Sequence, residues 1–208
     1  ANAPKAFWQI GLVQFFCWFA FLYMWNYTTG GIAENVWGVD TALKSSTTTP
    51  EYQAAGDWTG VLFAVQAIGS ILWAMVIPMF RNPKTAYSVS LLLGAVGFIS
   101  TYFIHDQYLL AVSFLLIGCA WAAMLALPFA LLTNALTGKS LGSYMGLFNC
   151  TICLPQIAAS LVGGLILGLV GGDVIDGVQT GQIAMLVVAG VSLLLGAVAV
   201  FGISTRKE

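Results

Sequence analysis

Residues 58–104 read WTGVLFAVQAIGSILWAMVIPMFRNPKTAYSVSLLLGAVGFISTYFI, and this stretch decides the fold. It contains two apolar runs of about 20 residues, each long enough to cross the roughly 30 Å hydrocarbon core of a bilayer as a helix. The turn Arg81-Asn82-Pro83-Lys84, with two basic residues, separates the runs. The stretch therefore predicts a helical hairpin that crosses a membrane twice.

The same pattern covers the rest of the chain. Of its 208 residues, 59% are hydrophobic and only 7% are charged, and the mean hydropathy is +0.90. This composition excludes an ordinary soluble domain. We predict an all-α transmembrane bundle in a lipid bilayer, with a polar external loop over residues 37–57. The six predicted spans are residues 7–33, 58–80, 85–104, 108–135, 141–170 and 178–203.

The charges sort by sign between these spans. The basic residues Lys5, Arg81 with Lys84, Lys139, and Arg206 with Lys207 occupy every second gap. The gaps between them contain Lys44 and the acids Glu34, Asp40, Glu51, Asp57, Asp106, Asp173 and Asp176. Because Lys and Arg mark the cytoplasmic side of short loops, we predict a plasma-membrane protein with both termini in the cytoplasm. No basic cluster is dense enough to indicate nucleic-acid binding.

Sequence signs of enzymatic or metal chemistry are missing. Cys150 and Cys153 form a C-x-x-C pair inside an apolar run, with no further Cys or His nearby, so we interpret them as packing residues. The chain has no H-E-x-x-H, no G-x-S-x-G and no carboxylate pair within a span. We therefore predict no enzyme activity, no metal and no cofactor.

Small residues recur every four positions on the fifth predicted span. They predict close helix–helix contact faces, since small-x-x-x-small patterns let backbones approach in lipid. The two series are Gly138, Gly142, Gly146 and Cys150, followed by Gly164, Gly168 and Gly172.

Neutral polar and aromatic side chains form stripes on three spans. Asn149, Cys153, Gln156 and Ser160 share one helix face, and Pro155 frees the carbonyl of Thr151 within that stretch. Amides and indole rings together suit a neutral sugar, whose C–H faces pack on rings and whose hydroxyls bond amides. The same amides could instead bond neighbouring helices, for about 0.6 kcal/mol each. The candidate binding residues are Gln14, Trp18, Trp25, Asn26, Gln66, Trp73, Trp121, Asn149 and Gln156.

Several of these segments resemble one family of transporters. The segments are 127–132 (LPFALL), 138–139 (GK), 142–149 (GSYMGLFN), 154–156 (LPQ), 18–22 (WFAFL) and 25–28 (WNYT). They resemble the C-terminal half of sucrose-transporter-like major facilitator proteins, in the glycoside–cation symporter group. Plant sucrose carriers of that group have acidic residues around the position of Trp25 to Tyr27, and this chain does not.

The resemblance implies a fold and a mechanism. Each half of such a transporter has six helices in two inverted three-helix repeats, and the substrate binds between the halves. We expect this chain, which starts at Ala1, to be a fragment corresponding to helices seven to twelve, partnered by an N-terminal half. The implied function is proton-coupled uptake of sucrose, maltose or a related glycoside by alternating access. The coupling group is then expected in the N-terminal half.

Two other readings remain open from the sequence. A self-sufficient six-helix protein could form a homodimeric carrier through its glycine faces. A channel or a non-transporting membrane scaffold is the other alternative, although the chain has no ring of charges or repeated pore motif.

Overall fold

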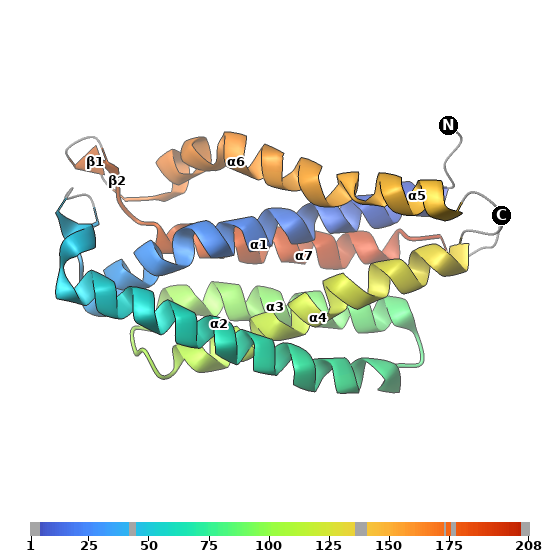
Figure 1. The fold of residues 1–208 in the computed structure, drawn as a ribbon, viewed down its shortest axis with the longest axis horizontal. Helices are drawn as coiled ribbons and strands as arrows, with labels where there is room; N and C mark the ends of the chain where they lie inside the picture. The colour runs from blue at the N-terminus through green and yellow to red at the C-terminus, as the bar shows by residue number, and fades with distance from the viewer. Residues whose placement is uncertain (1–4, 42–44, 136–140, 173, 176–177, 205–208) are drawn as a thin grey trace.

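The computed structural model describes residues 5–41, 45–135, 141–172, 174–175 and 178–204 (Figure 1). Within these ranges six helical spans are long and apolar enough to cross a membrane, which confirms the prediction of a six-span helical protein. The helices are α1 (Lys5–Trp37), α2 (Pro50–Val76), α3 (Pro83–Phe103), α4 (Leu110–Ala135), α5 (Leu141–Phe148), α6 (Cys150–Val170) and α7 (Ile183–Phe201). The fifth span, Gly146–Val170, consists of the end of α5 and all of α6.

The remaining described elements are short. They are the 3-10 turns η1 (Ser46–Thr48) and η2 (Ile77–Met79), and the strands β1 (Val174–Ile175) and β2 (Val178–Gln179), which pair antiparallel. Several charged residues used in the topology prediction lie outside the described residues. These are Lys44, Lys139, Asp173, Asp176, Arg206 and Lys207.

The helices pack in a specific pattern. Helix α1 packs on α6 and α7, α4 packs on α2 and α3, and α3 packs on α7. Helices α6 and α2 run along the two long edges of the bundle, with the other spans between them (Figure 1). The start of α1 and the end of α7 lie at one end of the bundle, where the Ser204 amide donates to Gln9 Oε1 at 2.7 Å.

The predicted external loop over 37–57 is wrong in its second half, because α2 begins at Pro50 rather than at residue 58. The helix start has a clear local cause. The Thr49 hydroxyl oxygen accepts from the Tyr52 amide at 3.2 Å, Pro50 occupies the first turn, and Glu51 complements the helix dipole. At the other boundary, Gly38 (φ 64°) follows the end of α1, in a left-handed conformation suited to glycine.

Two further boundaries differ from the prediction. Residues 178–179 belong to the β1–β2 hairpin, so α7 begins only at Ile183. The span predicted over 141–170 is interrupted at Asn149, where the turn tightens. There the Asn149 amide donates to the Gly146 carbonyl at 3.2 Å, and the Thr151 hydroxyl donates to the Phe148 carbonyl at 2.6 Å. The backbone bond from Asn149 to Gly146 spans three residues, as in a 3-10 turn, instead of the four of a regular α-helix.

One close helix crossing for which glycine is essential joins α2 to α4. A Cβ on Gly118 would lie 2.4 Å from the Gln66 carbonyl oxygen, and one on Gly69 would lie 2.6 Å from the Leu115 carbonyl oxygen. Backbone meets backbone here, so neither position has room for a side chain. Lipid provides little hydrophobic drive between helices, and such close approach supplies the dispersion contact instead.

Among the described residues, the predicted glycine faces on the fifth span do not form helix–helix contacts. A Cβ on Gly142, Gly146, Gly164 or Gly168 would meet nothing within 4 Å, and Cys150 is exposed. Only Gly172 is close to another residue, the Thr180 hydroxyl, while Gly138 lies outside the described residues. The prediction failed because periodicity locates a face but does not say which helix, if any, covers it.

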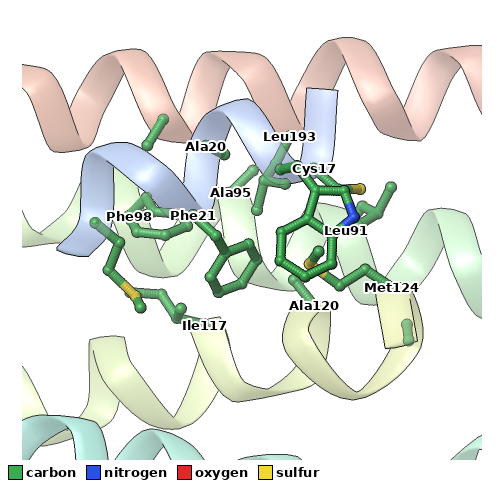
Figure 2. Packing of buried hydrophobic residues seen from close by; sticks show 14 of the residues in the cluster. Cys17, Ala20, Phe21, Leu91, Ala95, Phe98, Ile117, Ala120, Met124 and Leu193 are labelled. Atoms are coloured by element: carbon green, nitrogen blue, oxygen red, sulfur yellow. The ribbon is translucent and has the colours of Figure 1, made fainter. Parts of the chain in front are cut away.

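The core lies where α1, α3, α4 and α7 meet. Small residues such as Ala95 and Ala120 bring these helices together, and Phe21, Phe98 and Leu193 fill the space between them (Figure 2). The packing of this core holds α1 and α4 in contact, and the candidate site is found at that contact.

Candidate functional site

Four aromatic side chains gather where α1 meets α4, and we call them the aromatic cluster: Trp18, Phe21, Trp25 and Trp121. The first three are spaced i, i+3 and i+7 on α1, so they share one helix face. The Trp121 ring from α4 lies 4.9 Å from Phe21, 5.9 Å from Trp18 and 5.8 Å from Trp25 between centroids. The Trp18 and Trp25 rings are 6.5 Å apart. The fold thus brings together three of the predicted binding residues, from two helices that are far apart along the chain.

Phe21 was missing from the sequence-based set. It is fully buried and makes the shortest ring contact of the aromatic cluster. Its spacing of three residues from Trp18 and four from Trp25 was a sufficient signal, because that spacing places all three on one helix face.

The side chains of the aromatic cluster differ in how much of their surface is exposed. Trp25 is 42% exposed and Trp121 is half-buried, whereas Trp18 is only 8% exposed. The indole N–H of Trp18 is fully shielded and has no hydrogen-bond partner among the described residues. An unpaired buried donor costs about 1–3 kcal/mol, so this N–H favours any ligand oxygen that reaches it. Trp25 is the side of the aromatic cluster that is open to the surroundings.

Gln14 lies one helical turn before Trp18, but it does not reach the exposed part of the aromatic cluster. Its side chain is 1% exposed. The amide nitrogen donates to the Met124 carbonyl, and the amide oxygen accepts from the Tyr87 hydroxyl, both at 3.4 Å. Both ends of the amide are therefore occupied by neighbouring helices.

The two candidates on α2 lie along its packed side. Gln66 is 7% exposed, beside the close α2–α4 crossing, and its amide makes no hydrogen bond to another described residue. Trp73 points to α3 instead, where its indole N–H donates to the Ser90 hydroxyl at 2.8 Å. The structure does not bring Trp73 to the aromatic cluster.

The candidates on α6, and Asn26 in the second half of α1, are wholly or partly exposed. Asn149 and Asn26 are exposed, and Gln156 is half-buried. Helix α6 is joined to α1 by the Tyr23 hydroxyl, which donates to the Ala159 carbonyl at 3.2 Å. In the described part of the chain no hydrogen bond or ring contact links Asn149 or Gln156 to the aromatic cluster. Their predicted roles in binding stay predictions.

Two adjacent residues of α1 tie the ends of other helices together. One oxygen of Glu34 accepts from the Gln182 amide at 2.8 Å, at the start of α7, and the other accepts from the Thr41 hydroxyl. The Asn35 amide donates to three carbonyls at the end of α3, those of Thr101 (3.1 Å), Tyr102 (3.4 Å) and Ile104 (3.1 Å). A carboxylate at a helix N-terminus and an N–H donor at a C-terminus both complement the helix dipoles.

A hollow of about 490 Å³ lies away from the aromatic cluster, between α3, α7 and the end of α6. Its lining is apolar apart from the hydroxyl of Tyr102, so it offers almost no hydrogen bonds to a polar solute. In the ranges that the structure describes, no group of three or more His, Cys, Asp or Glu residues could hold a metal ion. Cys150 and Cys153 are free and exposed, so they are not packing residues within this bundle.

The aromatic cluster is thus the described site that best combines apolar ring surface, a buried donor and access from outside. Comparison with known proteins adds no identification. No protein-family model matches the sequence, and no curated protein is significantly similar to it.

Proposed function

We propose that this chain is one half of a secondary active transporter for a small neutral polyhydroxylated solute, a sugar such as sucrose, maltose or a related glycoside. The observation that carries the proposal is the aromatic cluster, which combines closely spaced rings with the buried and unpaired indole N–H of Trp18. Sugars present C–H faces to aromatic rings and hydroxyl oxygens to N–H donors. An ionic solute would need charge-assisted partners, which this cluster does not contain.

The helix packing supports a half built of two inverted repeats. Exchanging α1 with α4, α2 with α6 and α3 with α7 reproduces the main packing pattern. The α1–α7 pair then corresponds to α4–α3, the α1–α6 pair to α4–α2, and the α3–α7 pair to itself. Transporters with such repeats bind substrate near mid-membrane at the repeat interface, and the aromatic cluster lies where α1 meets α4.

The buried fractions of the six spans show the same correspondence between the two repeats. In α2 and α6 only 17% of the most apolar window is buried, against 56% or more in each of the other four spans. Two related helices are therefore left largely uncovered, together with the open side of the aromatic cluster. This pattern favours a second half that packs over α2 and α6 and completes the site.

Proton coupling is the expectation that goes with the sucrose-transporter-like resemblance. Glu34 and Asp57 lie near the outer ends of their helices, and the Glu34 oxygens are engaged by the Gln182 amide and the Thr41 hydroxyl. We therefore assign the coupling carboxylate to the partner half. We further propose that both chain ends of this half lie on the cytoplasmic side of the plasma membrane.

A second candidate is a six-helix carrier that works as a homodimer. The open glycines Gly142, Gly146, Gly164 and Gly168 favour it, because they leave a helix face free for a second copy. The mass of the native polypeptide in its source membrane separates the two. A band near 22.1 kDa supports the homodimer, and one at about twice that mass supports a half transporter.

The solute itself is tested on the native polypeptide reconstituted into vesicles. We expect saturable uptake of labelled sucrose or maltose and stimulation of that uptake by unlabelled sugar on the opposite side, which a channel does not show. Trp25→Phe and Trp121→Phe should raise the KM severalfold, because each removes part of the ring surface. Asn149→Ala and Gln156→Ala should also weaken uptake without preventing folding. Trp8→Phe is the control, since Trp8 is exposed and lies outside the aromatic cluster.

Absence of counterflow with every neutral mono- and disaccharide tried would refute the sugar assignment. Equal effects of the Trp8, Trp25 and Trp121 substitutions would remove the aromatic cluster from the binding site.

A further inference from the structure

Helix α4 contains an internal proline that leaves a backbone carbonyl near the candidate site without its usual donor. Pro128 lies within α4 and is buried. Because proline has no N–H, it cannot donate to the carbonyl four residues earlier, which belongs to Met124. Met124 is fully buried, so water does not replace the missing donor. In the middle of a membrane span such a carbonyl needs a donor from another part of the protein.

Gln14 of α1 supplies that donor. Its amide nitrogen points at the Met124 carbonyl at 3.4 Å, across the α1–α4 contact. The other end of the amide is held by the Tyr87 hydroxyl of α3, which in turn contacts the Cys17 sulfur at 3.7 Å. At 3.4 Å, both Gln14 bonds are longer than the usual N–H···O and O–H···O hydrogen bonds. All lie in a buried apolar region, where no water competes for the partners.

The contact lies beside the aromatic cluster. Met124 follows Trp121 by three residues on α4, and Gln14 precedes Trp18 by four residues on α1. The two helices run in opposite directions here, so the Gln14–Met124 contact is the next one along the crossing from the Trp18–Trp121 contact. Trp121 therefore lies close to the Gln14–Met124 contact, and we expect loss of that contact to shift the Trp121 ring relative to Trp18.

We propose that Gln14 is a positioning residue that replaces the missing N–H of Pro128, holds the bend of α4 against α1, and so sets the place of Trp121. The replacement of the N–H stands independently of the solute, whereas its effect on binding rests on the proposed function. Gln14 acts through α4 and not as a solute ligand, because both ends of its amide are already engaged and its side chain is 1% exposed.

A double-mutant cycle tests this directly. Pro128→Ala restores a backbone N–H for the Met124 carbonyl, and Gln14→Met keeps the side-chain length but removes the donor. With Pro128 present, we expect Gln14→Met to lower the folded-to-unfolded ratio in a detergent unfolding titration by about three- to tenfold. In the Pro128→Ala background, the same change should cost less than about twofold, because the carbonyl no longer needs Gln14.

Gln66→Met is the matched control. Gln66 is a buried amide on α2 that makes no hydrogen bond to another described residue, so its substitution should show no coupling to Pro128→Ala. Near-UV circular dichroism supplies a readout that general loss of stability does not move. The close tryptophan rings should give a coupled signal that changes in folded Gln14→Met and returns in the double variant.

Equal cost of Gln14→Met in both backgrounds would overturn the proposal. If Gln14→Met alone does not fold, recovery of folded protein in the double variant supports the proposal and failure to recover overturns it. The unfolding cycle requires no solute, so failure of the sugar assignment leaves it interpretable. If solute binds and Gln14→Met raises the KM equally in the wild-type and Pro128→Ala backgrounds, Gln14 is a ligand and the proposal fails.

Discussion

Replacing Gly118 of α4 with alanine, at the α2–α4 crossing, is expected to destabilise the bundle. The same change at an open glycine of α2 should stabilise it. The Cβ of Gly118→Ala would lie 2.4 Å from the Gln66 carbonyl oxygen and 2.7 Å from the Ser70 nitrogen. Both neighbours are backbone atoms of α2, which cannot rotate away as a flexible side chain can. The two helices must separate instead, and overpacking of this kind costs about 1–3 kcal/mol.

Gly60→Ala is the matched substitution. Gly60 lies inside α2, and a Cβ there would meet nothing within 4 Å. Replacing a helical glycine with alanine gains about 0.8–1.0 kcal/mol of helix propensity, and both variants receive that gain. The difference between the two variants is therefore the overpacking cost alone, about 1–3 kcal/mol, with Gly118→Ala the less stable.

Detergent unfolding followed by far-UV circular dichroism measures this difference. For a chain of this size, a gap of about 1–3 kcal/mol corresponds to a difference in Tm of roughly 2–12 °C. Gly69→Ala should behave like Gly118→Ala, and the double variant should cost less than the sum, because one separation of the helices relieves both contacts. Equal stabilities of Gly118→Ala and Gly60→Ala would refute the close α2–α4 crossing.

Two other substitutions test the ties between helices. Asn35→Ala should speed amide hydrogen exchange at the last turn of α3, because it removes the donor shared by three carbonyls there; unchanged exchange would show that water replaces Asn35 without loss. Ser192→Ala removes the 2.8 Å bond from the Ser192 hydroxyl of α7 to the Phe16 carbonyl of α1 and should lower the free energy of unfolding by about 0.6 kcal/mol, at most about 1.7 kcal/mol. A loss beyond that range in the unfolding titration would mean that the hydroxyl does more than join two helices.

The candidate site was only partly predictable from the sequence. Trp18, Trp25 and Trp121 were predicted from composition and spacing, and the fold brings them together. Gln14 and Trp73 satisfied the same criteria, yet their polar groups bond to neighbouring helices. Side-chain type and periodicity define a helix face, but they do not reveal which partner the face meets.

Some helix boundaries could likewise be predicted from the sequence, and others could not. Asn82 and Pro83 start α3 by purely local means, since the Asn82 side chain accepts from the Lys84 amide at 2.9 Å. Thr49, Pro50 and Glu51 start α2 equally locally, and this signal was present in the sequence although the expected loop concealed it. The hairpin before α7 lies in a polar gap whose secondary structure hydropathy does not specify. The break at Asn149 lies within one apolar run, so hydropathy did not predict it either.

The sequence by itself determined that this protein is helical and has six spans suited to a membrane, because a bilayer requires long apolar segments with internally satisfied backbones. Only the tertiary structure decided which residues meet. Gly60 and Gly118 are alike in sequence terms, and so are the amides of Gln14 and Gln66, yet their surroundings differ completely. Apolar periodicity turns a helix face toward its neighbours, but backbone approach at a few glycines sets the register of the crossings. That register places the aromatic cluster between α1 and α4.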